Sequence, residues 1–178
     1  GMANYLTDPV FRAALAHPPE DDPRSAIRHF LGVFGNPTLT WGDLIALRGW
    51  TRLPVLLKGV LHPDDARRAL DAGVDGLIVS NHGGRQLDGA PGPIEVLPAI
   101  NAAVGDKMTL MYDSGIRRGN DVVKAIALGA RAAMVGRPYL YALAAAGQEG
   151  VEKLSDLMGR IGSYAQLYSA QDQSDPER

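Results

Sequence analysis

The stretch VDGLIVSNHGGRQLDG, residues 74 to 89, joins an apolar run directly to a polar one. Its first part, VDGLIV, has the length and composition of a buried β-strand. The strand candidate is followed within six positions by an amide, an imidazole, two glycines and a guanidinium. A polar turn would account for these residues in isolation, so their meaning depends on the rest of the chain.

This segment is one of four strand and helix units that follow each other from about residue 53. Each strand candidate is a short apolar run without clean alternation, which is typical of a parallel strand covered on both faces. Alternating units of this kind indicate an α/β fold with a parallel sheet, either doubly wound or a barrel. The other three strand candidates are LPVLLKG (53–59), MTLMYD (108–113) and ARAAMVG (130–136).

Proline and glycine mark the ends of the helices between these strands. Helices are predicted from Pro63 to a stop at Gly73, and from about Pro93 to Val104. A third helix covers DVVKAIAL with Gly129 at its C-cap, and a fourth covers YLYALAAAG. These signals divide the chain into an irregular segment over 1–38 with a short helix near SAIRHFLG, a domain over 39–170, and a flexible tail over 171–178.

The composition argues against several kinds of binding partner. The net charge of −2 without a basic cluster argues against nucleic acid and membrane surfaces as partners, so a small molecule is the expected one. A chain without cysteine has no thiolate metal site, and nothing else in the sequence suggests a metal. The absence of cysteine fits a cytoplasmic protein. The apolar stretches are far shorter than a membrane span.

Polar side chains gather at the C-terminal ends of the predicted strands. Ligands bind at this edge in parallel βα folds, because the connecting loops and helix N-termini converge there. His82 could transfer a proton and Arg85 could bind a carboxylate. In the competing interpretation, Arg85 pairs with Asp88 and His82 only caps the loop. The residues expected around one site are Lys58, His82, Arg85, Asp113, Arg117 and Arg137.

The loops DSGIRRG and VGRP have the character of a phosphate site. Glycines allow backbone amides to approach an anion, a following helix adds its positive N-terminus, and Arg117 or Arg137 can bind in a bidentate manner. An ordinary glycine turn with solvated arginines is the alternative.

These residues resemble the FMN-dependent enzymes that oxidise α-hydroxy acids, a family that includes glycolate oxidase, lactate oxidase, lactate monooxygenase and flavocytochrome b2. The similarity runs through LPVLLKGVLHPDDARRALDAGVDGLIVSNHGGRQLDG, DSGIRRGNDVVKAIALGA and VGRPYLYALAAAGQEGV. LTWGDLIALRGWTRLPVLLKGVLHPDDA is most similar to the lactate 2-monooxygenase branch. The resemblance implies the C-terminal half of a TIM (β/α)₈ barrel, with about four βα units and FMN at the C-terminal mouth.

The resemblance also implies roles for single residues. His82 would be the catalytic base and Arg85 would bind the substrate carboxylate, so that a small, lactate-like L-2-hydroxy acid is oxidised to the 2-keto acid. Oxygen would reoxidise the flavin, with decarboxylation if the keto acid stays bound. Ser114 departs from the glycine that is more frequent in the family at this position. The residues implied in FMN binding are Lys58, Ser80, Gly83, Asp113, Ser114, Gly115, Arg117, Gly136 and Arg137.

Four parallel strands alone would leave two unpaired edges and an open apolar face. Three expectations follow from the half-barrel: a homodimer that closes an eight-stranded barrel, association with an N-terminal half-barrel on another chain, or a flavin- or phosphate-binding fragment without turnover.

Overall fold

The computed structural model describes the backbone of residues 2 to 172 and the side chains as far as residue 157. The chain consists of two compact units, residues 1–43 and 44–178. The expected flexible tail, 171–178, falls almost wholly outside the described residues, and the division into three parts stays a prediction.

The first unit is helical, which corrects the expectation of a mostly irregular segment. It contains α1 (Ala3–Thr7), α2 (Pro9–Ala13) and α3 (Pro23–Phe34). The carboxylates of Asp8 and Asp22 start α2 and α3 by accepting the backbone N–H of Phe11 at 2.8 Å and of Ser25 at 3.1 Å. The ring of Tyr5 packs edge-on against Phe11 and Phe30.

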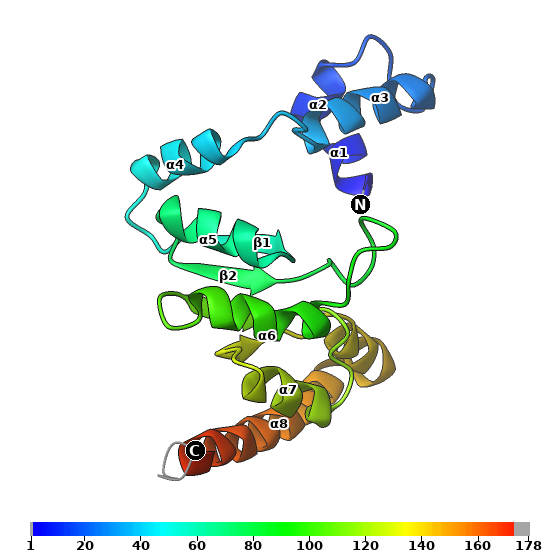
Figure 1. The fold of residues 1–178 in the computed structure, drawn as a ribbon. Coiled ribbons are helices and arrows are strands. Elements are labelled where there is room, and N and C mark those ends of the chain that lie inside the picture. The colour runs from blue at the N-terminus through cyan, green and yellow to red at the C-terminus, as the bar shows by residue number, and fades with distance from the viewer. Residues whose placement is uncertain (1, 173–178) are drawn as a thin grey trace. The chain divides into compact units, whose positions relative to one another are not determined.

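The second unit carries the parallel sheet, whose strand order β1-β2-β3-β4 follows the chain. All three strand pairs are parallel, and α5, α6 and α7 are stacked in chain order beside the sheet (Figure 1). These four units are half of the eight in a TIM barrel, which confirms the predicted fold class. Helix α4 (Trp41–Trp50) begins just before the boundary of this unit. The elements after it are β1 (Leu56–Val60), α5 (Pro63–Asp71), β2 (Gly76–Val79), α6 (Pro93–Val104), β3 (Thr109–Tyr112), α7 (Gly119–Ala127), β4 (Ala132–Ala133) and α8 (Arg137–Asp172).

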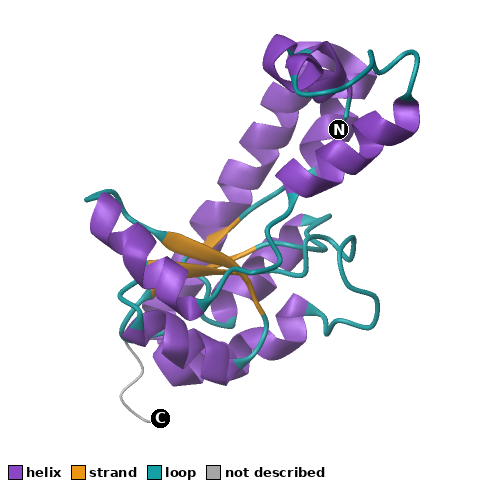
Figure 2. Ribbon diagram, turned by 90° about the horizontal axis from the view of Figure 1, so that it is seen from above, coloured by secondary structure: helices purple, strands orange, loops and turns teal. Residues whose placement is uncertain are grey.

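Only one face of the sheet is fully buried. Leu77 pairs with Leu110 and Val79 with Tyr112, and all four side chains belong to the core together with Leu97 of α6. The opposite face carries Lys58, Ile78 and Met111, which are exposed or half-buried. The strands are therefore not covered on both faces within this chain, contrary to the pattern expected from their apolar runs. Figure 2 shows the strands in orange with the helices around them.

The helix ends follow the predicted signals. The imidazole Nδ1 of His62 caps α5 by accepting the Asp64 N–H at 3.2 Å, and α5 is followed by Gly73 at φ +79°. Helix α6 has the predicted bounds, and Gly129 follows α7 at φ +107°. These local signals determine where each helix begins and ends between its two neighbouring strands.

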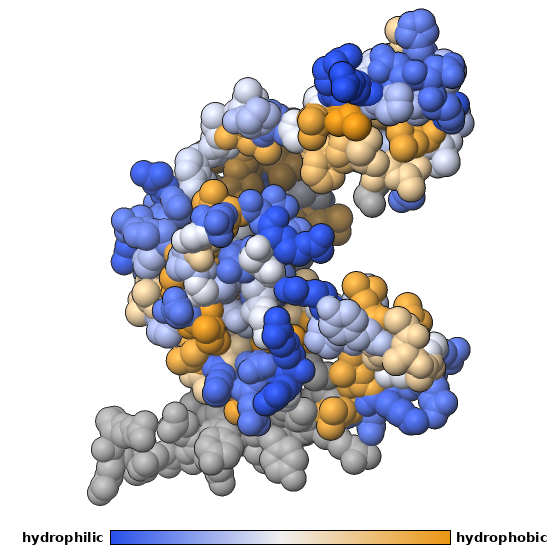
Figure 3. All heavy atoms as spheres, turned by 90° about the vertical axis from the view of Figure 1, so that its right-hand side faces the viewer, coloured by the Kyte–Doolittle hydropathy of each residue, from blue (hydrophilic) through white to orange (hydrophobic). Residues whose placement is uncertain are grey.

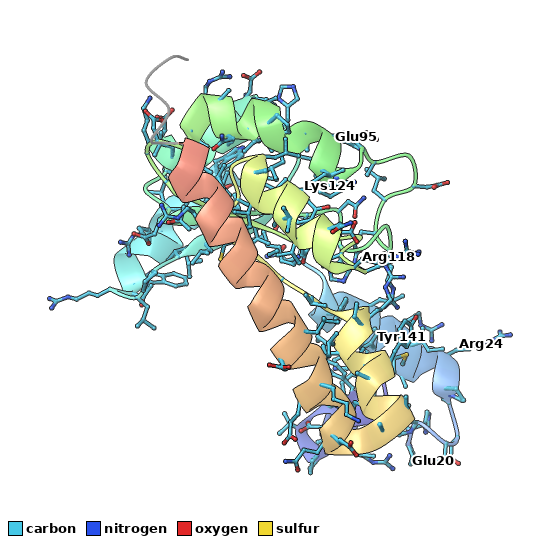
Figure 4. The ribbon with its side chains drawn as sticks, turned by 90° about the horizontal axis from the view of Figure 1, so that it is seen from below. Glu20, Arg24, Glu95, Arg118, Lys124 and Tyr141 are labelled. Atoms are coloured by element: carbon cyan, nitrogen blue, oxygen red, sulfur yellow. The ribbon has the colours of Figure 1, made fainter. Side chains whose placement is uncertain are left out.

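The last unit differs most from its prediction. Strand β4 is paired over two residues only, whereas seven were expected. Helix α8 begins at Arg137, two residues before the predicted helix, changes direction at Ala146 and Gly147, and continues as a second helical segment (Figure 4). Because Gly147 has φ +56°, the backbone leaves the right-handed helical region there.

Exposed apolar side chains interrupt the polar surface, as the orange residues in Figure 3 show. In the second unit they include Ile45, Trp50 and Leu53 close to β1 in sequence, and Tyr139, Leu140 and Tyr141 in α8. Within residues 2–172, no helix is long and apolar enough to cross a membrane. The expected cytoplasmic location stays a prediction.

Candidate active site

A pocket of about 790 Å³ lies where the C-terminal ends of the strands meet the loops that follow them. This volume is in the range of small-molecule sites. Ser80 does not line the pocket, because its side chain is buried beneath it, with 1 % of its surface exposed. The other predicted site residues all line it: Lys58, His82, Gly83, Arg85, Asp113, Ser114, Gly115, Arg117, Gly136 and Arg137.

The floor of the pocket is an ionic and hydrogen-bonded cluster around Lys58. Its ammonium group donates to Ser80 Oγ at 2.7 Å and forms an ion pair with Asp113. Burial raises the pKa of the Asp113 carboxyl, but the hydrogen bonds from Lys58, Ser80 and Ser114 outweigh it, so the net pKa is below its ordinary value. The carboxylate is therefore ionised at neutral pH and holds the side chain of Lys58, which lies within β1.

The loop that carries His82 has an unusual backbone. His82 has φ +59°, and Gly83 and Gly84 follow at +68° and +72°. A left-handed conformation is unfavourable for a residue with a Cβ atom, so strain is concentrated at His82. The loop is fixed by its amides: the His82 N–H donates to Ser80 Oγ at 3.0 Å, and the Gly84 N–H to Asn81 Oδ1 at 3.0 Å.

The alternative interpretation of His82 and Arg85 receives no support from the contacts. Among the described residues no ion pair joins Arg85 to Asp88, whose carboxylate instead accepts the Gly89 N–H at 3.2 Å. No side-chain hydrogen bond is described for His82 either. Both side chains are exposed at the pocket and are able to meet a ligand.

The VGRP loop meets the His82 loop at the pocket. Arg137 Nη2 donates to the carbonyl of Gly83 at 3.2 Å, so the start of α8 is tied to the His82 loop. A Cβ atom at Gly83 would lie 3.0 Å from the same nitrogen, which leaves little room for a side chain there. Arg137 also begins α8, where the first backbone N–H groups have no partner within the helix.

The DSGIRRG loop is organised by a residue that the sequence analysis did not select. The Asp121 carboxylate accepts the backbone N–H groups of Arg117 and Arg118, both at 2.9 Å, and these bonds lower its pKa. Two amides expected to face an anion are thus already bound. Positive groups that can still face an anion here include the guanidinium groups of Arg117 and Arg137 and the N-terminus of α8.

The donor set fits a flavin mononucleotide. Gly115 and Gly136 have open space where a Cβ atom would stand, so a ligand can approach the backbone closely. Positive side chains outnumber the single lining carboxylate, Asp113, which suits a phosphate. Sequence reasoning missed an apolar part of the lining that suits a flat ring system: Ile116, Met134, Val135, Pro138, Tyr139, Leu140 and Tyr141. Figure 4 labels Tyr141 on the first segment of α8.

Parallel strands, a basic pocket at their C-terminal edge and paired histidine and arginine residues define a flavin-binding TIM-barrel class of protein. Residues 1–160 match the sequence model of the FMN-dependent dehydrogenases. The chain belongs to this family, which confirms the expected resemblance, and FMN is the cofactor of the family.

Individual relatives agree with this assignment. The chain is 50% identical over 151 residues to an L-lactate oxidase of Lysinibacillus sphaericus, covering 85% of this chain and 38% of the relative. It is 57% identical over 122 residues to a pre-mycofactocin synthase of Mycobacterium tuberculosis, covering 68% and 31%. The structure of a mandelate oxidase variant with a monooxide FMN adduct matches with a TM-score of 0.68 and 55% identity, over 71% of this chain and 40% of that one. The chain spans less than half the length of these relatives.

Proposed function

We propose that this chain supplies the FMN-binding and proton-accepting part of an enzyme that oxidises a small, lactate-like L-2-hydroxy acid to its 2-keto acid, or decarboxylates it oxidatively with oxygen. The observation that supports the proposal most is the gathering of His82, Arg85, Lys58 and two further arginines around one pocket. Different side chains at one edge of the sheet would then bind the carboxylate, remove the proton and bind the phosphate.

Each side chain has a defined task in this proposal. Arg85 binds the substrate carboxylate with its planar guanidinium group, and His82 accepts the proton from the 2-hydroxy acid. Arg117 and Arg137 hold the phosphate, while Lys58, fixed by Asp113, supplies positive charge at the floor of the pocket. FMN, when bound, would accept the two electrons and the second proton that the acid loses.

The proposed substrate class rests on the relatives. An L-lactate oxidase and an L-lactate dehydrogenase of Alcaligenes faecalis share 50% and 55% identity with this chain. The mandelate oxidases are named for an aromatic hydroxy acid, so the size of the side chain that the pocket accepts has to be measured. Lactate is the first acid to test.

An absorption spectrum of the purified protein, followed by anaerobic titration with L-lactate, tests the proposal. We expect a visible flavin band that loses its colour when the acid is added. If FMN is bound and no small 2-hydroxy acid removes the colour, the chain is a flavin-binding protein without this activity. If the protein is colourless and FMN does not raise its melting temperature, the cofactor proposal is wrong.

Two substitutions separate the roles of the side chains. His82→Gln should abolish flavin reduction with little change in the Kd for FMN, whereas Arg137→Gln should weaken FMN binding first. Arg131→Gln provides the matched control, because Arg131 is exposed and does not line the pocket. The reverse pattern for the first two variants would contradict the assigned roles.

We further propose that a complementary half-barrel, supplied by a second copy of this chain, covers the open face of the sheet. Within the described residues β1 pairs only with β2 and β4 only with β3. The sheet face with Ile78 and Met111 is only half-buried, and apolar side chains close to β1 in sequence are exposed. Light scattering of the 178-residue chain should give a dimer. A monomer that stays soluble at micromolar concentration would exclude this closure.

A further inference from the structure

Ser114 combines an unfavourable backbone conformation with a dense set of hydrogen bonds. Its φ is +82°, in the left-handed region that favours glycine. Non-glycine residues persist there where surrounding contacts hold them. Ser114 lies directly after Asp113 at the end of β3, and its contacts show what holds it.

The Ser114 hydroxyl links two loops that are distant in sequence. Its Oγ accepts the backbone N–H of Gly83 at 2.9 Å and that of Asn81 at 3.3 Å. It donates to Asp113 Oδ1 at 2.9 Å. The Tyr112 hydroxyl donates to the Ser114 carbonyl at 2.6 Å and restrains the same residue from its other side.

The His82 loop has a backbone that needs several bonds to hold its shape, among them those of His82 to Ser80 and of Gly84 to Asn81. Two of the three consecutive residues with positive φ are glycines, which have the widest conformational freedom. Ser80 holds the amide of His82, and Ser114 holds the next amide, that of Gly83. Without the Ser114 hydroxyl, the Gly83 amide loses its side-chain acceptor.

We infer that Ser114 is a positioning residue whose hydroxyl holds the His82 loop against the end of β3. Through Asp113 it also belongs to the cluster that fixes Lys58, so one side chain sets the relative position of the imidazole and the ammonium group. The part of this inference that concerns catalysis rests on the proposed function. The part that concerns the loop does not.

Amide hydrogen exchange, measured by NMR on the full chain, tests the loop. In Ser114→Ala and Ser114→Gly, exchange at Gly83 should be faster by about fivefold or more, the effect of one lost hydrogen bond. The Asp113 amide, which donates to Val79 O in the sheet, should keep its rate and is the internal reference. Ser155→Ala is the control, because Ser155 is an exposed serine of α8 that does not line the pocket.

The two Ser114 variants separate the hydroxyl from the backbone. Glycine accepts φ +82° without strain, so Ser114→Gly should stay folded even where Ser114→Ala does not. If Gly83 in Ser114→Gly keeps the exchange rate of the unsubstituted protein, the hydroxyl does not hold the loop and the inference is overturned.

A second readout uses the FMN-loaded protein. Ser114→Gly should reduce the rate of flavin reduction at saturating L-lactate by about tenfold or more, because small displacements of a catalytic base are costly, with little change in the lactate concentration that gives half the maximal rate. Equal reduction rates in Ser114→Gly and the unsubstituted protein would overturn the positioning role. If the unsubstituted protein reduces no flavin, the proposed function fails, and the exchange rates still decide whether Ser114 holds the loop.

Discussion

The ion pair between Lys58 and Asp113 should stabilise the folded protein, and this contribution to the free energy of unfolding should depend on pH. The Asp113 carboxylate accepts hydrogen bonds from the Lys58 ammonium group and from the Ser114 hydroxyl. Hydrogen bonds to charged groups contribute about 1.5–3 kcal/mol each when buried. Because the side chains of Lys58 and Asp113 are 37% and 20% exposed, solvent screening reduces this value. We expect Asp113→Asn to lower the free energy of unfolding by roughly 1–2 kcal/mol at pH 7.

The pH dependence has a definite sign. The pKa of Asp113 in the folded protein is lower than its ordinary value of 3.8. The carboxylate therefore stabilises the folded state fully above pH 3.8, and this contribution is lost as the pH falls through the folded-state pKa. The difference in unfolding free energy between the unsubstituted protein and Asp113→Asn should be constant from about pH 5 to 7 and should narrow below about pH 3.8.

Urea unfolding followed by tryptophan fluorescence at several pH values measures this difference. Asp106→Asn is the control, because Asp106 is exposed and no side-chain hydrogen bond is described for it. A difference that is the same at pH 3 and pH 7, or one no larger than that of the control, would refute the assignment of a stabilising ionised carboxylate to Asp113.

Three further predictions concern packing and helix ends, each measured as a change in unfolding free energy or helix content. Leu97→Ala, at a fully buried position of α6, should cost about 2–5 kcal/mol, whereas Leu87→Ala, at a position 73% exposed, should change stability by less than about 0.5 kcal/mol. Gly76→Ala should destabilise the protein by about 1–3 kcal/mol, because the new Cβ in β2 would lie 2.7 Å from the Thr109 carbonyl oxygen. Gly32→Ala should stabilise the protein by about 0.5–1 kcal/mol, because a Cβ atom at this position of α3 meets no neighbour within 4 Å. Asp22→Ala should remove about 1 kcal/mol from α3 and reduce the helical signal in circular dichroism.

The helix bounds and the position of the site were the most predictable features. A proline at the first turn and a glycine just after the last one are local signals, so Pro63, Gly73 and Gly129 could be interpreted without tertiary structure. The site was predictable because the C-terminal ends of parallel strands share one edge. Lys58 and Arg137 therefore had to line the same pocket, whatever the details of packing.

Other features depend on signals that were overlooked or that sequence does not carry. The Asp-Pro pairs at Asp8 and Asp22 are helix starts of the same kind as the one at Pro63, and recognising them would have predicted α2 and α3. By contrast, an apolar strand run has the same composition whether one face or both are covered within the chain. The side-chain bonds of Ser114 and Asp121 depend on backbone direction, which residue types do not specify.

The pocket-lining residues of the second unit run from Lys58 to Tyr141 in one continuous stretch of the chain. A recombination event placed before this stretch would carry the groups proposed to bind phosphate, bind carboxylate and accept a proton together into a new context. Where a second copy of this chain supplies the other half of the barrel, as proposed, each change in this stretch enters both halves at once. The proposed site and the half that covers it would therefore change together.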